Sequence, residues 1–284
     1  MILSIENFLF REKFGEEIAL KMIKDAGFGG VDYSFNNHNQ DGSWGAIDLT
    51  ERKKVALQIK SLLDKYGLKC NQSHAPFYFE YGDKMDLEEK SFLDLVHSIE
   101  VASIIGAKII VIHAIKVPNG VDFYDYNHSF YKALQPYAEN CGIKIAVENL
   151  VNSKFWTPQE LCAFIKKLNS PVFTGCVDVG HSAIVGVEPE DFILGMDKEM
   201  VGCVHLHDTD GKIDRHWIPY QGNHNWEKII RSLLDCGFKG DMNLEVIHSF
   251  DNLPEKLYQP MLNYIALVGK ELIDKFNEYK TKVK

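Results

Sequence analysis

Hydrophobic and polar positions along the chain repeat one pattern. A segment with helical spacing of apolar residues ends at a glycine, a short apolar run follows, and the run ends in polar or ionisable residues. The clearest copies are KDAGFGGVDYSF, SIIGAKIIVIHAI and ENCGIKIAVENL. Glycine readily adopts the left-handed conformation just past a helix, so each copy predicts a helix end followed by a strand start.

This pattern predicts eight strands in the chain. Several of them are apolar on both faces for most of their length, as strands of a parallel sheet are when helices cover the sheet. They lie near residues 2–6, 30–35, 68–74, 108–113, 143–148, 172–178, 201–207 and 241–246.

A helix is predicted after each strand. Leu161, Phe164 and Leu168 share one helical face, and the TPQE segment at 157–160 has the capping residues of a helix start. The last predicted helix, over residues 255–280, is long and amphipathic. Eight β/α units without a Pro/Ser/Gly-rich linker predict an α/β fold, a single-domain (β/α)₈ TIM barrel over residues 1–284.

An open doubly wound sheet is the structural alternative. That fold would place a glycine-rich phosphate loop after an early strand, and neither G-x-G-x-x-G nor G-x-x-x-x-G-K-[ST] occurs in the chain. The barrel is therefore the preferred prediction.

Composition narrows the class of protein further. The 284 residues are 45% hydrophobic, enough for a large core, and the formal net charge of -9 disfavours a nucleic-acid partner. The six cysteines form no C-x-x-C pair, which indicates reduced thiols. The N-terminal MILSIENFLF lacks the basic region of a signal peptide, and the most apolar window, 101–117, contains charged residues. We therefore expect a soluble cytoplasmic protein that does not enter a membrane.

Candidate chemistry gathers where the predicted strands end, which is where TIM-barrel enzymes place their sites. Ionisable residues end six of the eight strands: His74, His113, Glu148, Asp178 with His181, His205 with His207, and Glu245. A single histidine at such a position is more often structural than a ligand. Carboxylates that converge on one barrel mouth, however, repel one another unless a metal ion or shared protons neutralise them. Mixed carboxylates and imidazoles suit Mn²⁺, Zn²⁺, Co²⁺ or Mg²⁺.

The motifs at these strand ends carry a resemblance to a known family. They are SHAPF (73–77), VIHA (111–114), AVEN (146–149), VDVGH (177–181), VHLHD (204–208), DRH (214–216) and NLEV (243–246). In this order and spacing, over nearly the whole chain, they resemble the xylose isomerase-like TIM barrel superfamily. That superfamily contains sugar isomerases, ketose 3-epimerases, inosose dehydratases and, as a more distant cousin, endonuclease IV.

The resemblance implies one divalent metal ion. Its ligands would be Glu148, Asp178, His205 and Glu245, with His205 preferred over His207 because the family has the first histidine of this motif there. His207 and the adjacent Asp208 are expected to orient neighbours, and Asp210 to be solvated. Residues that match substrate contacts, or the additional zinc ligands of the endonuclease, are His181, His74, His113, Asp214 and His216.

The resemblance also implies an activity. Glu148 and Glu245 would act as catalytic bases that remove and return a proton α to a carbonyl, through an enediolate, in a sugar or sugar phosphate. The expected protein is a metal-dependent isomerase or epimerase. The expected partner is a small sugar, and a homo-oligomer is left open.

Three alternatives remain beside the sugar isomerase or epimerase. One is a multi-zinc phosphodiesterase like endonuclease IV, with additional zinc at His74 and His113 or at His181, Asp214 and His216. The second is an inosose dehydratase-type lyase, and the third is a barrel that binds a small molecule without catalysis. The form VDVGH and the acidic balance favour the sugar enzymes, whereas WIPYQGN after DRH departs from the usual continuation in both groups.

Loops 34–48 and 75–86 are expected to cap the site. Their aromatic residues Phe35, Trp44, Phe77 and Tyr78 would either pack on a sugar face or cover the barrel rim.

Overall fold

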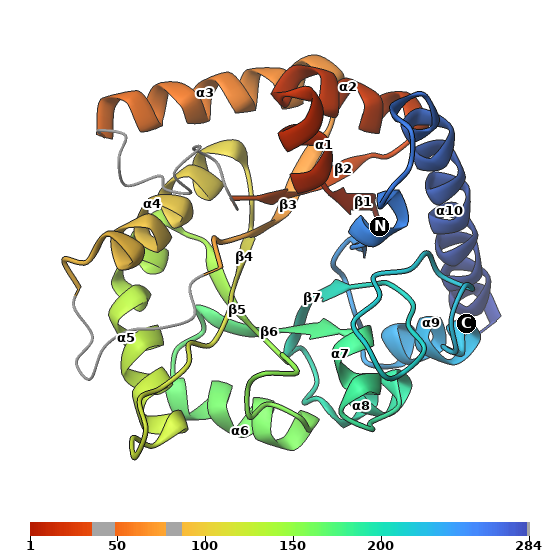
Figure 1. The fold of residues 1–284 in the computed structure, drawn as a ribbon. Helices are drawn as coiled ribbons and strands as arrows, with labels where there is room; N and C mark the ends of the chain where they lie inside the picture. Colours follow the sequence, from red (N-terminus) through yellow and green to blue (C-terminus); the bar gives the residue numbers. More distant parts are fainter. Residues whose placement is uncertain (36–48, 78–86, 283–284) are drawn as a thin grey trace.

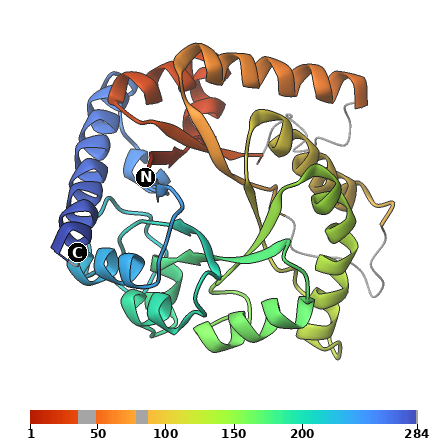
Figure 2. The ribbon, with the colours of Figure 1, turned by 180° about the vertical axis from the view of Figure 1, so that it is seen from behind.

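The computed structural model describes residues 1–35, 49–77 and 87–282, which form a barrel of eight parallel strands with helices around it (Figures 1 and 2). Neighbouring strands pair in chain order from β1 to β7, and β8 returns to pair with β1. The strands are β1 Leu3–Glu6, β2 Gly30–Ser34, β3 Lys69–His74, β4 Ile109–Ile112, β5 Lys144–Glu148, β6 Phe173–Asp178, β7 Val201–His205 and β8 Met242–Leu244.

The barrel closes between β7 and β8, just beyond the last residue of β7. The Leu206 N–H donates to the Asn243 carbonyl (3.0 Å), and the Glu245 N–H donates to the Leu206 carbonyl (3.1 Å). We call these two hydrogen bonds the closing seam. The seam lies directly beside His205 and Glu245, so the end of the barrel that carries the ionisable residues is also where the cylinder is completed.

These strands confirm the predicted TIM barrel, and the alternative of an open doubly wound sheet is wrong. Every predicted strand is present, within a few residues of its expected bounds. β7 ends at His205 and β8 at Leu244, two residues earlier than predicted in each case. The closing seam replaces regular strand pairing at this point, and the side chains after it are free to line the mouth of the barrel.

The helices lie outside the strands, as a parallel barrel requires (Figure 1). Among the described residues, no helix is both long and apolar enough to cross a membrane. The helices are α1 Phe8–Phe14, α2 Glu16–Ala26, α3 Leu49–Tyr66, α4 Lys90–Ile105, α5 Phe123–Cys141, α6 Pro158–Leu168, α7 Val179–Ile184, α8 Pro189–Gly195, α9 Trp226–Asp235 and α10 Tyr258–Lys282.

The predicted helix boundaries have the local causes that the sequence indicates. Thr157 caps α6: its hydroxyl accepts from the Glu160 N–H (3.3 Å), and the Glu160 carboxylate accepts from the Thr157 N–H (2.9 Å). Gly106, with φ 107°, ends α4 in the left-handed conformation. The last helix is preceded by a short 3₁₀ turn over Glu255–Leu257, so α10 starts three residues later than predicted.

Inside the barrel, the layer of side chains below the strand ends has two unlike halves. Because side chains alternate along a strand, this layer comes from residues two positions before those at the mouth. The apolar half, from β4 to β7, consists of Val111, Ala146, Cys176 and Cys203. The polar half, from β8 and β1 to β3, is a buried hydrogen-bonded set of Asn243, Ser4, Asp32 and Gln72.

Candidate active site

A cavity of about 520 Å³ opens at the carboxyl ends of the strands. Its lining includes apolar residues, among them Phe77, Ile115, Phe123, Ile184 and Ile213, and the two lysines Lys116 and Lys212. The residues of this cavity that the sequence singled out are His113, Glu148, His181, Asp214, His216 and Glu245. The other three, His74, Asp178 and His205, are buried close to these residues. The fold therefore brings all nine candidate residues to one place.

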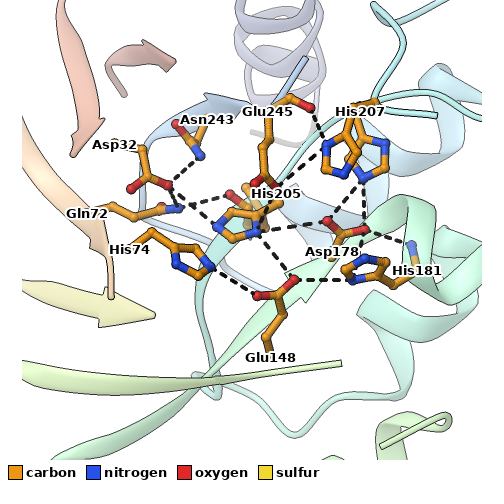
Figure 3. Close-up of polar contacts among 12 residues, drawn as sticks. Asp32, Gln72, His74, Glu148, Asp178, His181, His205, His207, Asn243 and Glu245 are labelled. Atoms are coloured by element: carbon orange, nitrogen blue, oxygen red, sulfur yellow. Dashed lines mark hydrogen bonds and ion pairs between the residues drawn. The ribbon is translucent and has the colours of Figure 1, made fainter. Parts of the chain in front are cut away.

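Four of these residues form a central cluster, defined as Glu148, Asp178, His205 and Glu245. The Nδ1 atom of His205 lies 3.1 Å from Glu245 Oε2, 3.5 Å from Glu148 Oε1 and 3.9 Å from Asp178 Oδ2 (Figure 3). Glu148, Asp178 and His205 end three consecutive strands, and Glu245 follows β8 across the closing seam. Three carboxylates thus surround one imidazole nitrogen.

The charges of the central cluster are strongly coupled. Burial alone would lower the pKa of His205, but the Cys176 thiol and the nearby carboxylates raise this pKa well above its usual value. Burial would raise the pKa of Glu148, but His113 and His205 hold it well below the usual range. Glu245 behaves likewise: despite burial, His205 lowers its pKa. The cluster therefore consists of ionised carboxylates that require a positive charge at their centre.

A divalent cation fits this set of donors. Ligand atoms of Asp178, His205 and Glu245 lie within 4.8 Å of one another, and so do those of Glu148, Cys176 and His205. Carboxylates with one imidazole suit Mn²⁺, Mg²⁺, Co²⁺ or Zn²⁺, and a nearby thiol adds to the preference for zinc. His205 belongs to both groups, so a single ion beside its imidazole could contact members of either group.

Next to the central cluster lies a second group, the His74 cluster, formed by His74, His113 and the same Glu148. The two Nε2 atoms of the histidines are 3.1 Å apart, and Glu148 Oε2 lies 2.9 Å from that of His113 and 3.6 Å from that of His74. Burial would lower the pKa of His74, but its contact with Glu148 raises it to about 9. Burial lowers the pKa of His113 despite that carboxylate.

A third group, the Asp214 cluster, consists of Asp214, His181 and His216. Asp214 Oδ2 lies 3.2 Å from His181 Nε2 and 3.0 Å from His216 Nε2. The His181 Nδ1 atom is in turn 3.2 Å from Glu148 Oε1, which connects this cluster to the central one. Burial would lower the pKa of His216, but Asp214 raises it to about 9. The Asp214 carboxylate therefore stabilises the protonated form of both histidines.

His207 orients a member of the central cluster, as the sequence predicted. Its Nε2 atom lies 3.0 Å from each carboxylate oxygen of Asp178. A Cβ atom on Gly180 would lie 2.0 Å from His207 Cε1, so the ring can occupy this position only beside a glycine. Asn149 secures Asp178 from the other side by exchanging two hydrogen bonds with its backbone, at 2.7 and 2.9 Å. Asp178 thus has little freedom to move.

The segment after β7 is held by two aspartates rather than by one. Asp208 is fully buried and accepts hydrogen bonds from the Trp226 indole (2.8 Å) and the Tyr220 N–H (2.9 Å). Asp210 is partly exposed, and in addition it accepts from the Lys212 N–H (2.9 Å) and pairs with Arg215, contacts that the sequence did not predict. Short loops often close on such side-chain-to-backbone bonds, and this one carries Asp214 to the cavity.

The loop aromatics have different fates. Phe77 lines the cavity and stacks on His113, with ring centroids 4.8 Å apart. Phe35 is fully buried and packs on Tyr33, which argues against the first of its two expected roles, packing on a sugar face. Trp44 and Tyr78 lie outside the described residues.

Sequence reasoning missed the polar residues below the mouth: Asp32, Gln72 and Asn243. A usable signal was present, because Gln72 precedes His74 by two positions and Asn243 precedes Glu245 by two. Residues two apart on a strand point to the same side, so a polar residue at this spacing also faces the barrel interior. The sequence did not show that these residues would meet one another.

Comparisons with known proteins agree with the fold. The family model for xylose isomerase-like TIM barrels matches residues 20–266. An uncharacterised protein of Methanocaldococcus jannaschii is 25% identical over 236 residues, which cover 76% of this chain and 77% of that protein. The fructoselysine 3-epimerase of Escherichia coli O157:H7 is 28% identical over 140 residues, covering 48% of this chain and 50% of that protein.

Among solved structures, a D-tagatose 3-epimerase-like protein superposes on this chain with a TM-score of 0.75 and 20% identity, covering 100% of both chains. At this identity the similarity concerns the fold. The family model, in contrast, matches most of the sequence, including every residue of the three clusters. The chain therefore belongs to the family of xylose isomerase-like TIM barrels.

Proposed function

We propose that this protein is a divalent-metal-dependent epimerase or isomerase of a sugar or sugar phosphate. One observation carries the proposal: Glu148 and Glu245 line the same cavity and approach the same His205 nitrogen from opposite sides (Figure 3). The names of the relatives, a fructoselysine 3-epimerase and a D-tagatose 3-epimerase-like protein, support a sugar substrate.

The metal ion would be held by the central cluster and would polarise the substrate carbonyl as a Lewis acid. The protein itself supplies the bases. Because their histidine neighbours lower the pKa values of Glu148 and Glu245, both carboxylates are ionised at neutral pH and can accept a proton from carbon. His181, whose pKa is raised by Asp178 and Asp214 despite burial, can donate a hydrogen bond to the developing oxyanion.

The placement of the two carboxylates determines the kind of proton transfer. If one glutamate removes a proton from one face of the enediolate and the other returns a proton to the opposite face, the product is an epimer. If a single glutamate moves the proton between adjacent carbons, the product is an aldose–ketose isomer. Glu148 and Glu245 come from β5 and from the segment after β8, so they can serve opposite faces.

Replacing either base tests the proposal. Glu148→Gln and Glu245→Gln are each expected to lower turnover of the best ketose substrate by about 10²- to 10⁴-fold, the usual contribution of positioned proton transfer. The measurement is turnover over a panel of ketoses, ketose phosphates and an inosose, each with Mn²⁺, Co²⁺, Zn²⁺ or Mg²⁺. Loss of water from the inosose would identify the lyase alternative.

The matched control is Glu271→Gln on α10, which removes an exposed carboxylate paired with Lys275. It should retain wild-type turnover, and circular dichroism should show that all three variants are folded. Wild-type rates in either Glu148→Gln or Glu245→Gln would contradict the assignment of the bases.

A second candidate function, a multinuclear metal phosphodiesterase, is favoured by a separate observation. Glu148 lies within 3.6 Å of four histidines, His74, His113, His181 and His205, so it can bridge adjacent metal sites. The His74 cluster offers a further set of ligands, and so does the group of His207, Asp214 and His216. Metal analysis of the purified protein distinguishes the two functions: one ion per chain supports the sugar enzyme, and three support the phosphodiesterase.

A nicking assay on duplex DNA with an abasic site completes this comparison. The sugar-enzyme proposal expects no metal-dependent cleavage of such DNA. Cleavage that requires both Glu148 and His113 would replace that proposal with the phosphodiesterase.

A further inference from the structure

Asp32 is a fully buried carboxylate in the middle of β2, below the central cluster and outside every group of candidate ligands described above. Two amide groups donate hydrogen bonds to its Oδ2 atom, and an imidazole nitrogen lies near the same atom (Figure 3). Gln72 Nε2 lies at 2.7 Å, Asn243 Nδ2 at 2.9 Å and His205 Nε2 at 3.5 Å. A buried carboxyl group is costly unless it has hydrogen-bond partners.

The hydrogen bonds around Asp32 run in one direction. The Ser4 hydroxyl donates to the Asn243 side-chain oxygen (3.0 Å), so the Asn243 amide nitrogen must face Asp32. The Gln72 amide nitrogen likewise donates to Asp32. Both amides thus present N–H groups to a carboxylate oxygen, which accepts hydrogen bonds.

This direction favours one state of His205 when a metal ion is bound. Its Nε2 atom lies 3.5 Å from the Asp32 carboxylate, so a ring that gives up one proton to bind metal keeps the other on Nε2 and has its lone pair on Nδ1. That Nδ1 atom is the one that faces Glu148, Asp178 and Glu245. A lone pair among three carboxylates is repulsive by itself and becomes favourable when a cation lies between them.

We propose that Asp32 is a positioning residue for the metal, which fixes His205 as an Nδ1 ligand through its Nε2–H. This inference rests on the metal site of the proposed function. A carboxylate behind a metal-binding histidine fixes the tautomer and ring orientation and increases the basicity of the ligand nitrogen. This role explains the polar half of the interior layer. Asn243 and Gln72 orient the Asp32 carboxylate, Ser4 orients Asn243, and Asp32 in turn orients His205.

The test is the metal affinity of Asp32→Asn, which keeps the volume of the side chain and removes its charge. Competition with a chromophoric chelator should show a 10- to 100-fold weaker Kd for Mn²⁺ or Co²⁺, the range typical for loss of such a supporting group. The visible spectrum of the Co²⁺ protein should change as well, because the ligand orientation changes.

Asp241→Asn is the matched control. Asp241 is also a buried aspartate that accepts hydrogen bonds from an asparagine amide, Asn71, at 2.9 and 3.1 Å, but it lies at the opposite end of the barrel. A purely structural role for Asp32 would lower the melting temperature of the metal-free protein and leave the Kd unchanged. A Kd for Asp32→Asn within twofold of wild type, or an equal loss in Asp241→Asn, would overturn the inference.

The outcomes for Asp32 and for the proposed function are separable. If the wild type binds metal, Asp32→Asn weakens binding and no sugar is turned over, then the positioning role stands and the sugar proposal fails. If the wild type turns over a sugar and Asp32→Asn binds metal normally, then the positioning role fails alone.

Discussion

At the scale of single residues, Glu6 shows what burial does to an ionisable group near this site. It ends β1, is 5% exposed, and its Oε1 atom accepts the Phe8 N–H at 3.0 Å. Burial, reinforced by Glu245 and Asp32, raises its pKa to about 8. Glu6 is therefore protonated at neutral pH, unlike the carboxylates of the central cluster, which have histidine neighbours.

The raised pKa of Glu6 makes stability depend on pH. Between the ordinary pKa of 4.5 and about 8, the unfolded state binds fewer protons at this site than the folded state. The contribution of Glu6 to the free energy of unfolding is therefore fully present below pH 4.5 and is lost as the pH rises to 8. Glu6→Gln should remove this loss, because its carbonyl can still accept the Phe8 N–H.

We expect Glu6→Gln to raise the free energy of unfolding on the order of 1–3 kcal/mol at pH 8 and to change it little at pH 4.5. Urea unfolding of wild type and variant at both pH values measures this change in the free energy of unfolding. EDTA is present to remove any metal ion that would neutralise the nearby Glu245 carboxylate. Parallel pH dependence in wild type and variant would contradict the assignment.

At the scale of elements, the strand ends were predictable and the layer beneath them was not. Glu148 and Asp178 follow mostly apolar runs that begin just after a helix-ending glycine or a turn, so their positions at the mouth follow from local pattern. Asp32 and Asn243 are 211 residues apart, and their meeting depends on β8 returning to β1. Local sequence patterns do not contain that information.

The close contact between His207 and Gly180 could not be predicted from the sequence either. The sequence identified His207 as a residue that orients neighbours but did not show what it touches. In the structure its ring occupies the space beside Gly180, at the start of α7, where any larger residue would displace it from Asp178. The glycine of VDVGH is thus explained by packing against a residue just after the next strand, which requires the three-dimensional pairing of β6 with β7.

At the scale of the whole molecule, the central cluster joins β5, β6, β7 and the segment after β8. A ligand that binds only the folded state stabilises it by about 2.7 kcal/mol at a concentration 100 times its Kd. A metal ion held by four distant parts of the chain should therefore raise the melting temperature by several degrees, and EDTA should reverse the rise.

Asp178→Asn provides the control for this measurement. The substitution would keep the shape of the side chain but remove one of the three negative charges around His205, so the metal-dependent rise should shrink or vanish. A rise of unchanged size in this variant would show that the stabilising ion binds elsewhere. Differential scanning fluorimetry over a series of Mn²⁺ and Zn²⁺ concentrations gives the shift.

Local opening of the barrel at the closing seam should also affect how long an ion stays bound in the central cluster. Among the described residues, two backbone hydrogen bonds at Leu206 join the chain after β7 to the β8 segment, and His205 and Glu245 lie on its two sides. A brief fluctuation that breaks these bonds would also separate His205 from Glu245. Occupancy of the central cluster and amide hydrogen exchange at Leu206 and Glu245 are thus two measures of one local opening.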